Sequence, residues 1–510
     1  MNLRPLTPFR ALLACLVFVP LVRAADDSPV FIVKNDLIAS PTAPGSTTPQ
    51  LVNAPDGTVY LSWLEPAAAR HTALRFARFD AATRTWSPAR TIGESLTQSV
   101  PANLIPRLAV SSANTLAALW HPAANLATLT TSTDGGANWS NPVVLNRPSR
   151  LATHATLQSL PDGQLLVTWI EPEAKGGVLL ARTAAQDSAP VVVDPSVSAG
   201  CTPSLVVFPD GSALVAYRGL SPDGVRDIRT ARFHDGRWDA PAILSADNWK
   251  PSLPSRNSPA VVARGPHVAA AWFTSAEGAR VNVSTSDNAG AQWLIPNRVD
   301  DIAPLGFPGL VLFDDGSQLV SWIERTATGQ VILLRRISAR GNLSVPVQIG
   351  LTVDGAPPAL IRLKDGDTTP SQVLITTLNP PPSSSVPSSG LSTLNSQLST
   401  SSSAFITTRL ITLPSAAELA ETDPCNCDPR ADDVRGYPIK GRIVSIDSAS
   451  GTLQLDHAAI LGVMPAGTTT LQVGPEVLRS VQPGTTILAR IERTGPDWTL
   501  FNARTLEVSR

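Results

Sequence analysis

The sequence contains little tyrosine, methionine or cysteine, and little charge of either sign. Of its 510 residues three are Tyr, two Met and four Cys, and charged residues make up 16% with a formal net charge of -1. So few cysteines exclude a disulfide-dense scaffold. The sparse, balanced charge gives no basis for binding nucleic acid or an anionic membrane surface. The length allows two or more domains or one large all-β unit.

Long helices and membrane spans are also disfavoured. The chain contains 46 prolines, which interrupt helices. After the N-terminal leader, no segment reaches the roughly 18 to 20 apolar residues of a membrane helix. We therefore expect a largely β-structured chain with no membrane span.

Residues 1-24 have the pattern of a secretory signal peptide. A basic start precedes the apolar run ALLACLVFVPLV and a small-residue cleavage site at Val22-Arg23-Ala24. We expect an exported protein, periplasmic or secreted, whose mature chain begins near Ala25. The leader holds three arginines and no acid, so its removal takes the net charge from -1 to -4. LLAC at 12-15 faintly resembles a lipobox, which would instead give a lipid anchor.

A sequence motif is repeated along most of the remaining chain. It reads YLSWLEP, LAALWHP, LVTWIEP, LVAYRGL, AAAWFTS and LVSWIER, and its aromatic residues are spaced by 48 to 57 residues. This is the period of a four-stranded propeller blade. Before each copy runs a second line, with Pro in register in six of its seven occurrences, and Asp-Gly turns separate the two in most copies. Pro suits the first position of a strand, and Asp-Gly is a hairpin signal.

The repeats predict a ring of seven blades over residues 28-413. The seventh copy supplies three strands, and SPVFIVKND near the N-terminus resembles the missing fourth strand. Six blades remain the alternative if one weak repeat is irregular. The serine-rich run at 379-403 falls inside the last blade, where its composition predicts a disordered insertion.

Two short motifs recur at the turn between the third and fourth strands of a blade. STDGGANW at 132-139 and SDNAGAQW at 286-293 place turn-forming side chains, a glycine and a tryptophan at fixed spacing. Because the motif repeats with the blade, and an amide replaces the carboxylate in the second copy, we expect a structural role rather than an active site. The residues concerned are Ser132, Asp134, Gly136, Trp139, Ser286, Asn288, Gly290 and Trp293.

These two motifs resemble the Asp boxes of the sialidase-like β-propeller superfamily. The resemblance implies an active-site face opposite the motifs, with three arginines, a Tyr nucleophile activated by Glu, and an Asp acid/base. This chain departs from that pattern: Tyr60 and Tyr217 lie within repeated strands, Tyr437 lies outside the ring, and the Arg-Ile-Pro signature is missing. We assign no catalytic residue and favour a non-catalytic protein.

On the face opposite the Asp boxes, charged and polar residues at strand ends are expected to converge on the central channel. They are either solvated or paired charges, or the lining of a pocket for a carbohydrate or protein ligand. The candidates are Glu65, Arg107, His121, His154, Glu171, Arg218 and Glu324.

Residues 435-510 read as a second domain. Five short strand-like runs predict a small barrel of the oligonucleotide/oligosaccharide-binding (OB) type. Residues 437-508 resemble the CusF-like periplasmic copper-binding domains, and the resemblance places His457 at the ligand histidine and Met464 at the aromatic position. The two ligand methionine positions hold Gly467 and Thr469.

The linker, 414-434, carries the pair Cys425 and Cys427. Two thiolates spaced Cys-x-Cys suit Cu(I) or Zn(II), and His457 and Met464 are candidate added ligands. With Cys201 they form an odd set of three after leader cleavage, so a local disulfide, a bridge to Cys201 or thiols without function remain alternatives.

Three hypotheses follow. The first is an exported, non-catalytic binding propeller joined to a degenerate copper-binding-type domain, acting in envelope metal handling. The second is an exo-sialidase or other glycoside hydrolase, by analogy of fold. The third is a structural or assembly protein of the cell envelope.

Overall fold

The computed structural model describes most of the region after the leader. The described ranges are residues 34–68, 71–95, 105–123, 126–147, 149–183, 189–302, 304–326, 329–339, 341–353, 355–363, 371–381, 403–414, 437–457, 464, 467–494 and 497–506. The predicted signal peptide, the Cys-x-Cys pair and most of the serine-rich insertion lie outside these ranges.

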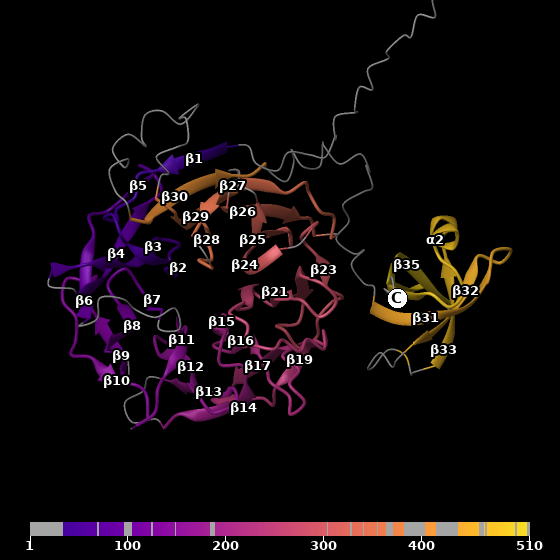
Figure 1. Cartoon of the computed structure of the whole chain (residues 1–510), viewed down its shortest axis with the longest axis horizontal. Helices are drawn as coiled ribbons and strands as arrows, with labels where there is room; N and C mark the ends of the chain where they lie inside the picture. The colour runs from indigo at the N-terminus through magenta and orange to yellow at the C-terminus, as the bar shows by residue number, and fades with distance from the viewer. Residues whose placement is uncertain are drawn as a thin grey trace, which may run out of the picture.

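Seven antiparallel sheets are arranged around a central axis, as Figure 1 shows, so the prediction of seven blades is confirmed. The first two blades contain β2 (Thr47–Asn53), β3 (Val59–Pro66), β4 (Thr72–Asp80), β5 (Thr85–Trp86) and β6 (Arg90–Ser95), then β7 (Arg107–Val110), β8 (Leu116–Ala123), β9 (Leu126–Ser132) and β10 (Val143–Val144). The third and fourth contain β11 (Thr153–Ser159), β12 (Leu165–Pro172), β13 (Gly177–Thr183) and β14 (Val191–Val197), then β15 (Ser204–Val207), β16 (Ala213–Arg218), β17 (Ile228–His234), β18 (Arg237–Trp238) and β19 (Ala242–Ser245).

The remaining three blades complete the ring. The fifth and sixth contain β20 (Ala260–Arg264), β21 (His267–Thr274), β22 (Arg280–Ser286) and β23 (Asn297–Arg298), then β24 (Pro304–Leu312), β25 (Gln318–Thr326), β26 (Gly329–Ile337) and β27 (Val347–Thr352). The seventh contains β28 (Ala359–Arg362), β29 (Gln372–Asn379), β30 (Phe405–Thr412) and the N-terminal strand β1 (Lys34–Ile38).

The ring closes where β1 pairs with β30. The pairing is antiparallel and in register from Lys34 opposite Thr412 to Ile38 opposite Thr408. The last blade is therefore built from both ends of the propeller segment. Only the end of SPVFIVKND belongs to β1, and the rest of that segment lies outside the described residues.

The core consists of apolar seams between neighbouring sheets. The second strands of the first six blades each carry a large aromatic residue, and among these Trp63, Trp169, Trp272 and Trp322 are at most 1% exposed. Trp169 of the third blade, for example, packs with Leu119 and Leu129 of the second. The repeated tryptophan is thus a packing residue that joins adjacent blades.

The Asp boxes have the structural role that the repeat predicts. In the second blade Ser132 Oγ donates to Asp134 Oδ1 at 2.8 Å and accepts from the Gly136 amide at 2.9 Å, while Asp134 Oδ1 accepts from the Asn138 amide at 2.9 Å. Hydrogen bonds from Asn138 and Ser132 lower the pKa of Asp134 to about 2. Trp139 meets Phe76 of the first blade edge-on, with ring centroids 6.1 Å apart.

The fifth-blade copy is built in the same way with an amide in place of the carboxylate. Ser286 Oγ donates to Asn288 Oδ1 at 2.9 Å and accepts from the Gly290 amide at 2.9 Å. Asn288 Oδ1 accepts from the Gln292 amide at 2.9 Å, and Trp293 packs against the seam with the fourth blade. A neutral acceptor suffices here, as expected of a turn and not of a catalytic acid.

Residues 437–506 form a closed five-stranded barrel. Its strands are β31 (Tyr437–Asp447), β32 (Thr452–His457), β33 (Gly467–Val473), β34 (Thr486–Thr494) and β35 (Asp497–Leu506), with the short helix α2 (Pro475–Ser480) between β33 and β34. The order β31-β32-β33-β35-β34 includes a parallel pairing of β33 with β35, which gives the predicted OB-type barrel. No helix within the described residues is long and apolar enough to cross a membrane.

The Asp-box glycine gives a stability prediction. At Gly136 φ is +81°, and an added Cβ would lie 2.4 Å from Phe76 Cζ, so Gly136→Ala combines backbone strain with overpacking of the seam. We expect a loss of about 2 to 4 kcal/mol in the free energy of unfolding, measured by urea denaturation.

Gly163→Ala is the matched control. Gly163 has φ +84° and nothing within 4 Å of an added Cβ, so only the strain applies there. The expected loss is about 1 kcal/mol. Equal losses for the two variants would contradict the seam-packing role of the Asp box.

Candidate functional site

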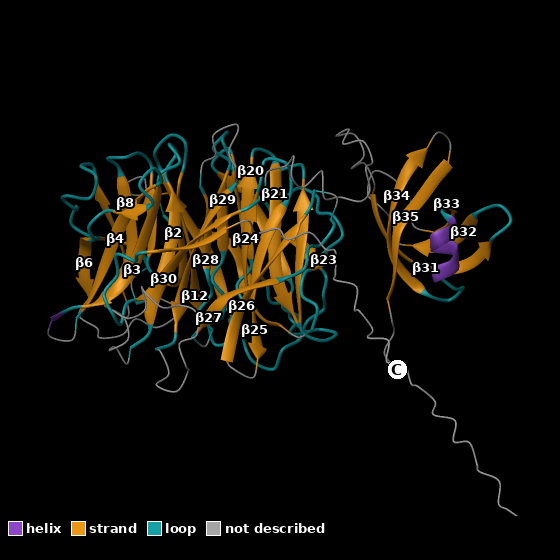
Figure 2. Cartoon of the chain, turned by 90° about the horizontal axis from the view of Figure 1, so that it is seen from above, coloured by secondary structure: helices purple, strands orange, loops and turns teal. Residues whose placement is uncertain are grey.

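The central channel contains the main cavity, with a volume of about 620 Å³. It is lined by residues in or next to the first strand of all seven blades: β2, β7, β11, β15, β20, β24 and β28. In each blade the first strand begins at the channel mouth, and the turn between third and fourth strands therefore lies at the other face. Figure 2 shows the blades from the side, with strands running between two loop-bearing faces. The cavity thus opens on the face opposite the Asp boxes.

Three of the first strands carry the same β-bulge at the mouth. The registers of β2, β11 and β24 against their neighbours each slip by one residue, between Thr47 and Gln50, between Thr153 and Thr156, and between Gly306 and Gly309. Each bulge contains one non-glycine residue with positive φ: Thr48 at +52°, His154 at +52° and Phe307 at +55°. A bulge changes the direction in which side chains point, and both His154 and Phe307 line the cavity.

Arg107 lies in the cavity wall at the start of β7. Its Nη1 donates to Gln50 Oε1 of the first blade, and its Nε donates to the Ala155 carbonyl of the third at 3.3 Å. Burial lowers the pKa of this guanidinium to about 10, so it stays charged at neutral pH. Arg107 therefore bridges three blades while presenting a positive charge to the channel.

His154 is buried beside Arg107. Its Nδ1 lies 3.0 Å from Thr202 Oγ1 of the next blade. Burial, opposed by a hydrogen bond with the Ala199 backbone and aided by the positive charge of Arg107, lowers the pKa of His154 to about 4. The imidazole is accordingly neutral at pH 7.

A second cation stands at the rim. Arg256 precedes β20, is exposed, and makes no hydrogen bond or ion pair with another described residue. A Cβ placed on Gly355 would lie 3.9 Å from Arg256 Nη2 and 3.4 Å from Phe307 Cζ. The guanidinium and the Phe307 ring therefore share one part of the rim, next to the open space at Gly355.

The polarity of the lining is one-sided. Arg107 and Arg256 are its charged residues, and the residues that line the cavity in the described part of the chain include no Asp or Glu. Hydroxyl and amide groups supply the remaining polarity, namely Gln50, Thr156, Gln158, Thr202, Ser204 and Ser258. Such a cavity favours an anion.

Five of the seven predicted pocket residues are not in this lining; three of these are glutamates. Glu65, Glu171 and Glu324 each stand two residues after a buried tryptophan and accept its indole N–H, at 2.9, 3.5 and 2.8 Å respectively. Glu171 also pairs with Arg147. A buried N–H needs a partner, so these carboxylates have a structural explanation.

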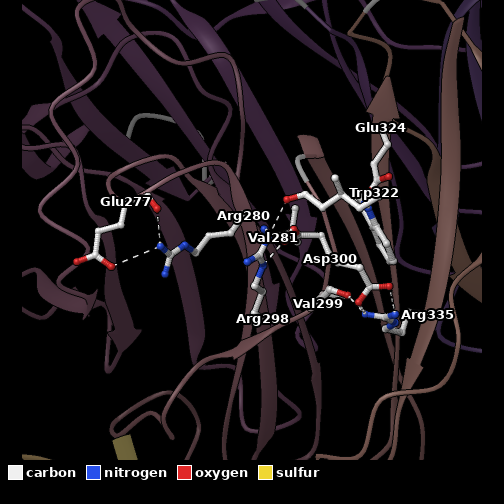
Figure 3. A network of polar contacts seen from close by, with 11 residues as sticks. Glu277, Arg280, Val281, Arg298, Val299, Asp300, Trp322, Glu324 and Arg335 are labelled. Carbon is white, nitrogen blue, oxygen red and sulfur yellow. Dashed lines mark hydrogen bonds and ion pairs between the residues drawn. The ribbon is translucent and has the colours of Figure 1, made fainter. Parts of the chain in front are cut away.

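The surroundings of Glu324 form a polar network between the fifth and sixth blades, drawn in Figure 3. Arg335 stacks below the Trp322 indole, 5.9 Å from its centroid, donates to the Val299 carbonyl and pairs with Asp301 at 2.5 Å. Asp300 Oδ1 accepts a hydrogen bond from the Val281 amide at 2.6 Å, and Asp300 Oδ2 pairs with Arg298 Nη2 at 2.7 Å. This network fastens one blade to the next and does not face the cavity.

His121 and Arg218 are the other two residues outside the lining. His121 Nε2 lies 3.1 Å from the Ala152 carbonyl of the next blade. Arg218, 1% exposed, donates to the carbonyls of Arg226 at 2.7 Å and Phe273 at 2.8 Å, and stacks on Trp249 at 4.7 Å. Arg107 and Arg218 therefore do not line one cavity, and Arg256 is the second arginine of the described cavity lining.

Tyr60 and Tyr217 do not line the cavity either. Tyr60 is buried among apolar residues of the seam between the first two blades. Tyr217 is 1% exposed, and its hydroxyl donates to Asp194 at 2.9 Å. Burial, followed by the negative charge of Asp194, raises the pKa of Tyr217, which disfavours the phenolate form of this side chain.

Sequence reasoning missed Gln50, Arg256 and Phe307. A signal existed, because all three lie on or immediately before a copy of the proline-containing line that begins each first strand. The motif TPQLV contains Gln50, and FPGLVL begins with Phe307.

In the barrel, His457 and Met464 are brought together by Thr469. Thr469 Oγ1 lies 2.8 Å from His457 Nε2 and donates to Met464 Sδ at 3.5 Å. One imidazole and one thioether, separated by a hydroxyl, do not fit a Cu(I) site that takes two thioethers and an imidazole. No cluster of three or more His, Cys, Asp or Glu suited to a metal ion occurs among the described residues. Cys425 and Cys427 lie outside them, and Cys201 is a buried free thiol.

No family model and no curated protein matches the sequence. Several solved structures resemble it at low identity. An ulvan lyase solved with GlcA(1-4)Rha3S has 12% identity over 76% of this chain and 100% of its own, with a TM-score of 0.47. An α-L-arabinofuranosidase from Fusarium graminearum, solved with an iminosugar inhibitor, has 12% identity over 76% of this chain and 97% of its own, with a TM-score of 0.39. A Hadza microbial sialidase has 14% identity over 55% of this chain and 63% of its own, with a TM-score of 0.34. Each is a similarity of fold.

The low pKa of His154 predicts a pH-dependent stability. Because its pKa falls from an ordinary 6.5 to about 4 on folding, protonation between these values favours the unfolded chain. The free energy of unfolding should fall by about 3 kcal/mol as the pH drops through this window.

His154→Asn isolates this effect, because Asn tolerates the positive φ and does not titrate. The difference in unfolding free energy between wild type and variant should shrink by about that amount from pH 7.5 to pH 4, measured by urea denaturation. A difference that stays constant with pH would show that His154 is not held neutral in the folded protein.

Proposed function

We propose that this is an exported, non-catalytic binding protein whose propeller channel holds the acidic group of a carbohydrate or protein ligand. The observation that carries the proposal is the pair of cations, Arg107 and Arg256, in a cavity whose described lining has no carboxylate. An anion would gain charge-assisted hydrogen bonds there without competing with a resident acid.

The two arginines suit different parts of this task. Arg107 is already fixed by Gln50 and the Ala155 carbonyl, so little side-chain entropy is lost when it binds. Arg256 has no partner among the described residues and is free to close on a ligand at the rim. His154, neutral at pH 7, adds a hydrogen-bonding group without a charge.

The same lining argues against a glycoside hydrolase. Hydrolysis by the common mechanisms takes two carboxyl groups about 5 to 10 Å apart across the scissile bond. Glu65, Glu171 and Glu324, the glutamates predicted on this face, accept hydrogen bonds from tryptophan N–H groups instead. Tyr217, which would have to replace one of them as a nucleophile, is buried and hydrogen-bonded.

The metal part of the proposal rests on Cys425 and Cys427. The barrel alone lacks a second thioether, and Thr469 stands where the resemblance to CusF-like domains implies a methionine. Two thiolates are soft ligands that bind Cu(I) or Zn(II) without a preformed pocket. We therefore assign envelope metal handling to the linker pair, with His457 and Met464 as secondary.

Removal of one channel charge should weaken the binding of an anion. For D-glucuronate, measured by isothermal titration calorimetry, we expect Arg107→Met and Arg256→Met each to lower affinity by about tenfold or more, the worth of a charge-assisted hydrogen bond. Arg237→Met, which removes an exposed arginine of the outer strand β18, is the matched control and should leave affinity unchanged.

Neutral D-glucose should bind more weakly than D-glucuronate to the wild-type protein. Equal affinity of the two sugars, or an equal loss with all three variants, would refute an anion site in the channel. Release of 4-methylumbelliferone from its sialic acid conjugate by the purified protein would refute the non-catalytic assignment.

Metal binding gives a separate test. Titration with Cu(I) under reducing conditions should show stoichiometric binding that is lost when Cys425→Ser is combined with Cys427→Ser. His457→Ala should retain it, because the barrel donors do not form a site by themselves. Equal Cu(I) binding by wild type and the double variant would remove the cysteine pair from the proposal.

A further inference from the structure

The side chain of Asn257 connects the fifth blade to the bulge of the sixth. Asn257 is 8% exposed and precedes β20. Its Oδ1 accepts from the Phe307 amide at 2.5 Å, and its Nδ2 donates to the Leu305 carbonyl at 3.1 Å. One amide side chain thus satisfies two backbone groups in the β24 bulge, where the register with β25 is interrupted.

The Asn257 side chain lies so close to the β24 backbone that the residue between Leu305 and Phe307 is a glycine. At Gly306 φ is +93°, and an added Cβ would lie 2.2 Å from Asn257 Oδ1. Phe307 follows with φ +55°, a conformation that a bulky residue adopts only when its surroundings impose it. The two hydrogen bonds of Asn257 supply that constraint.

The backbone around Asn257 is held from the other side by the fourth blade. Cys201 Sγ donates to the Ser255 carbonyl at 2.8 Å and to the Asn257 carbonyl at 3.3 Å. Arg218 Nη2 lies 3.5 Å from the same Asn257 carbonyl. These contacts hold the main-chain carbonyls on both sides of Arg256 without using the Asn257 side chain.

From this geometry we infer that Asn257 is a positioning residue that holds the Phe307 ring at the channel rim beside Arg256. The channel would then recognise the apolar face of a ligand ring as well as the charge of its acidic group. The inference rests on the proposed function of the channel. Phe307 would cover the face of a ligand ring whose acidic group pairs with the arginines. Asn257 itself touches only the protein.

A measurement without ligand tests the positioning. The Phe307 amide is protected by Asn257 Oδ1, so peptides covering residues 304–309 should exchange hydrogen for deuterium at least tenfold faster in Asn257→Ala. Asn257→Asp keeps an acceptor for this amide and should restore most of the protection. Asn282→Ala, at an equally buried asparagine of the same blade outside the cavity lining, should leave residues 304–309 unchanged.

Two probes test the consequence for recognition. D-glucuronate offers a ring face and a carboxylate, whereas inorganic sulfate offers charge alone. Asn257→Ala and Phe307→Ala should each lower the affinity for D-glucuronate by about fivefold to tenfold, in line with the loss of an aromatic contact, and should change that for sulfate by less than twofold. In a Phe307→Ala background, Asn257→Ala should have no further effect.

Each outcome is decisive. Equal losses for both probes, or additive losses in the double variant, would mean general damage and overturn the inference. Unchanged exchange of residues 304–309 in Asn257→Ala would overturn it as well. If the wild-type protein binds neither probe, the proposed function and the recognition role fail together, while the exchange experiment still shows whether Asn257 holds the bulge.

Discussion

The propeller depends on one antiparallel pairing, that of β1 with β30. Every other blade is made from one continuous stretch of chain, but the last needs a strand from the beginning of the ring. The seam beside it is apolar and joins Ile38 and Leu410 of the last blade to Val59 and Phe79 of the first. Closure fixes how many first strands surround the axis, and therefore the width of the channel in which the cavity lies.

A second constraint explains why polar residues near the channel are poor guides to function. Tryptophans fill the seams between blades, and burying an indole ring also buries its N–H, which requires an acceptor. In three blades a glutamate two residues later provides it, and in the fifth Asp247 accepts from Trp272 at 2.8 Å. The three glutamates stand at the ends of second strands, and Asp247 follows the last strand of the fourth blade, because the buried indoles need acceptors there.

The repeat made the fold predictable, because hydrophobic period, turn residues and the Asp boxes all indicate the same four-stranded unit. The site was less predictable for two physical reasons. A bulge depends on the register between strands, so nothing in THATL shows that His154 has positive φ. The pairing of an arginine depends on distant residues, which is why Arg218 and Arg256, both near a repeated line, have opposite environments. In the barrel, the resemblance to CusF-like domains placed Thr469 at a ligand position, but its hydrogen bonds to His457 and Met464 are visible only in the structure.

The two faces of the propeller differ in what their side chains do: one face stabilises the fold, and the other lines the cavity. On the face of the Asp boxes, each serine and acceptor side chain is used in bonding the turn, and the tryptophan closes the seam, so substitution there acts on stability. At the channel mouth polar side chains of neighbouring first strands contact each other, as Arg107 does with Gln50 and His154 with Thr202. Side chains that face the cavity can be substituted without unfolding the blade, provided that backbone segments such as the β24 bulge are held by contacts with the neighbouring blade. Asn257 meets that requirement from the neighbouring blade, so the shape of the rim is set by contacts between blades, while its chemistry is set by the residues that face the axis.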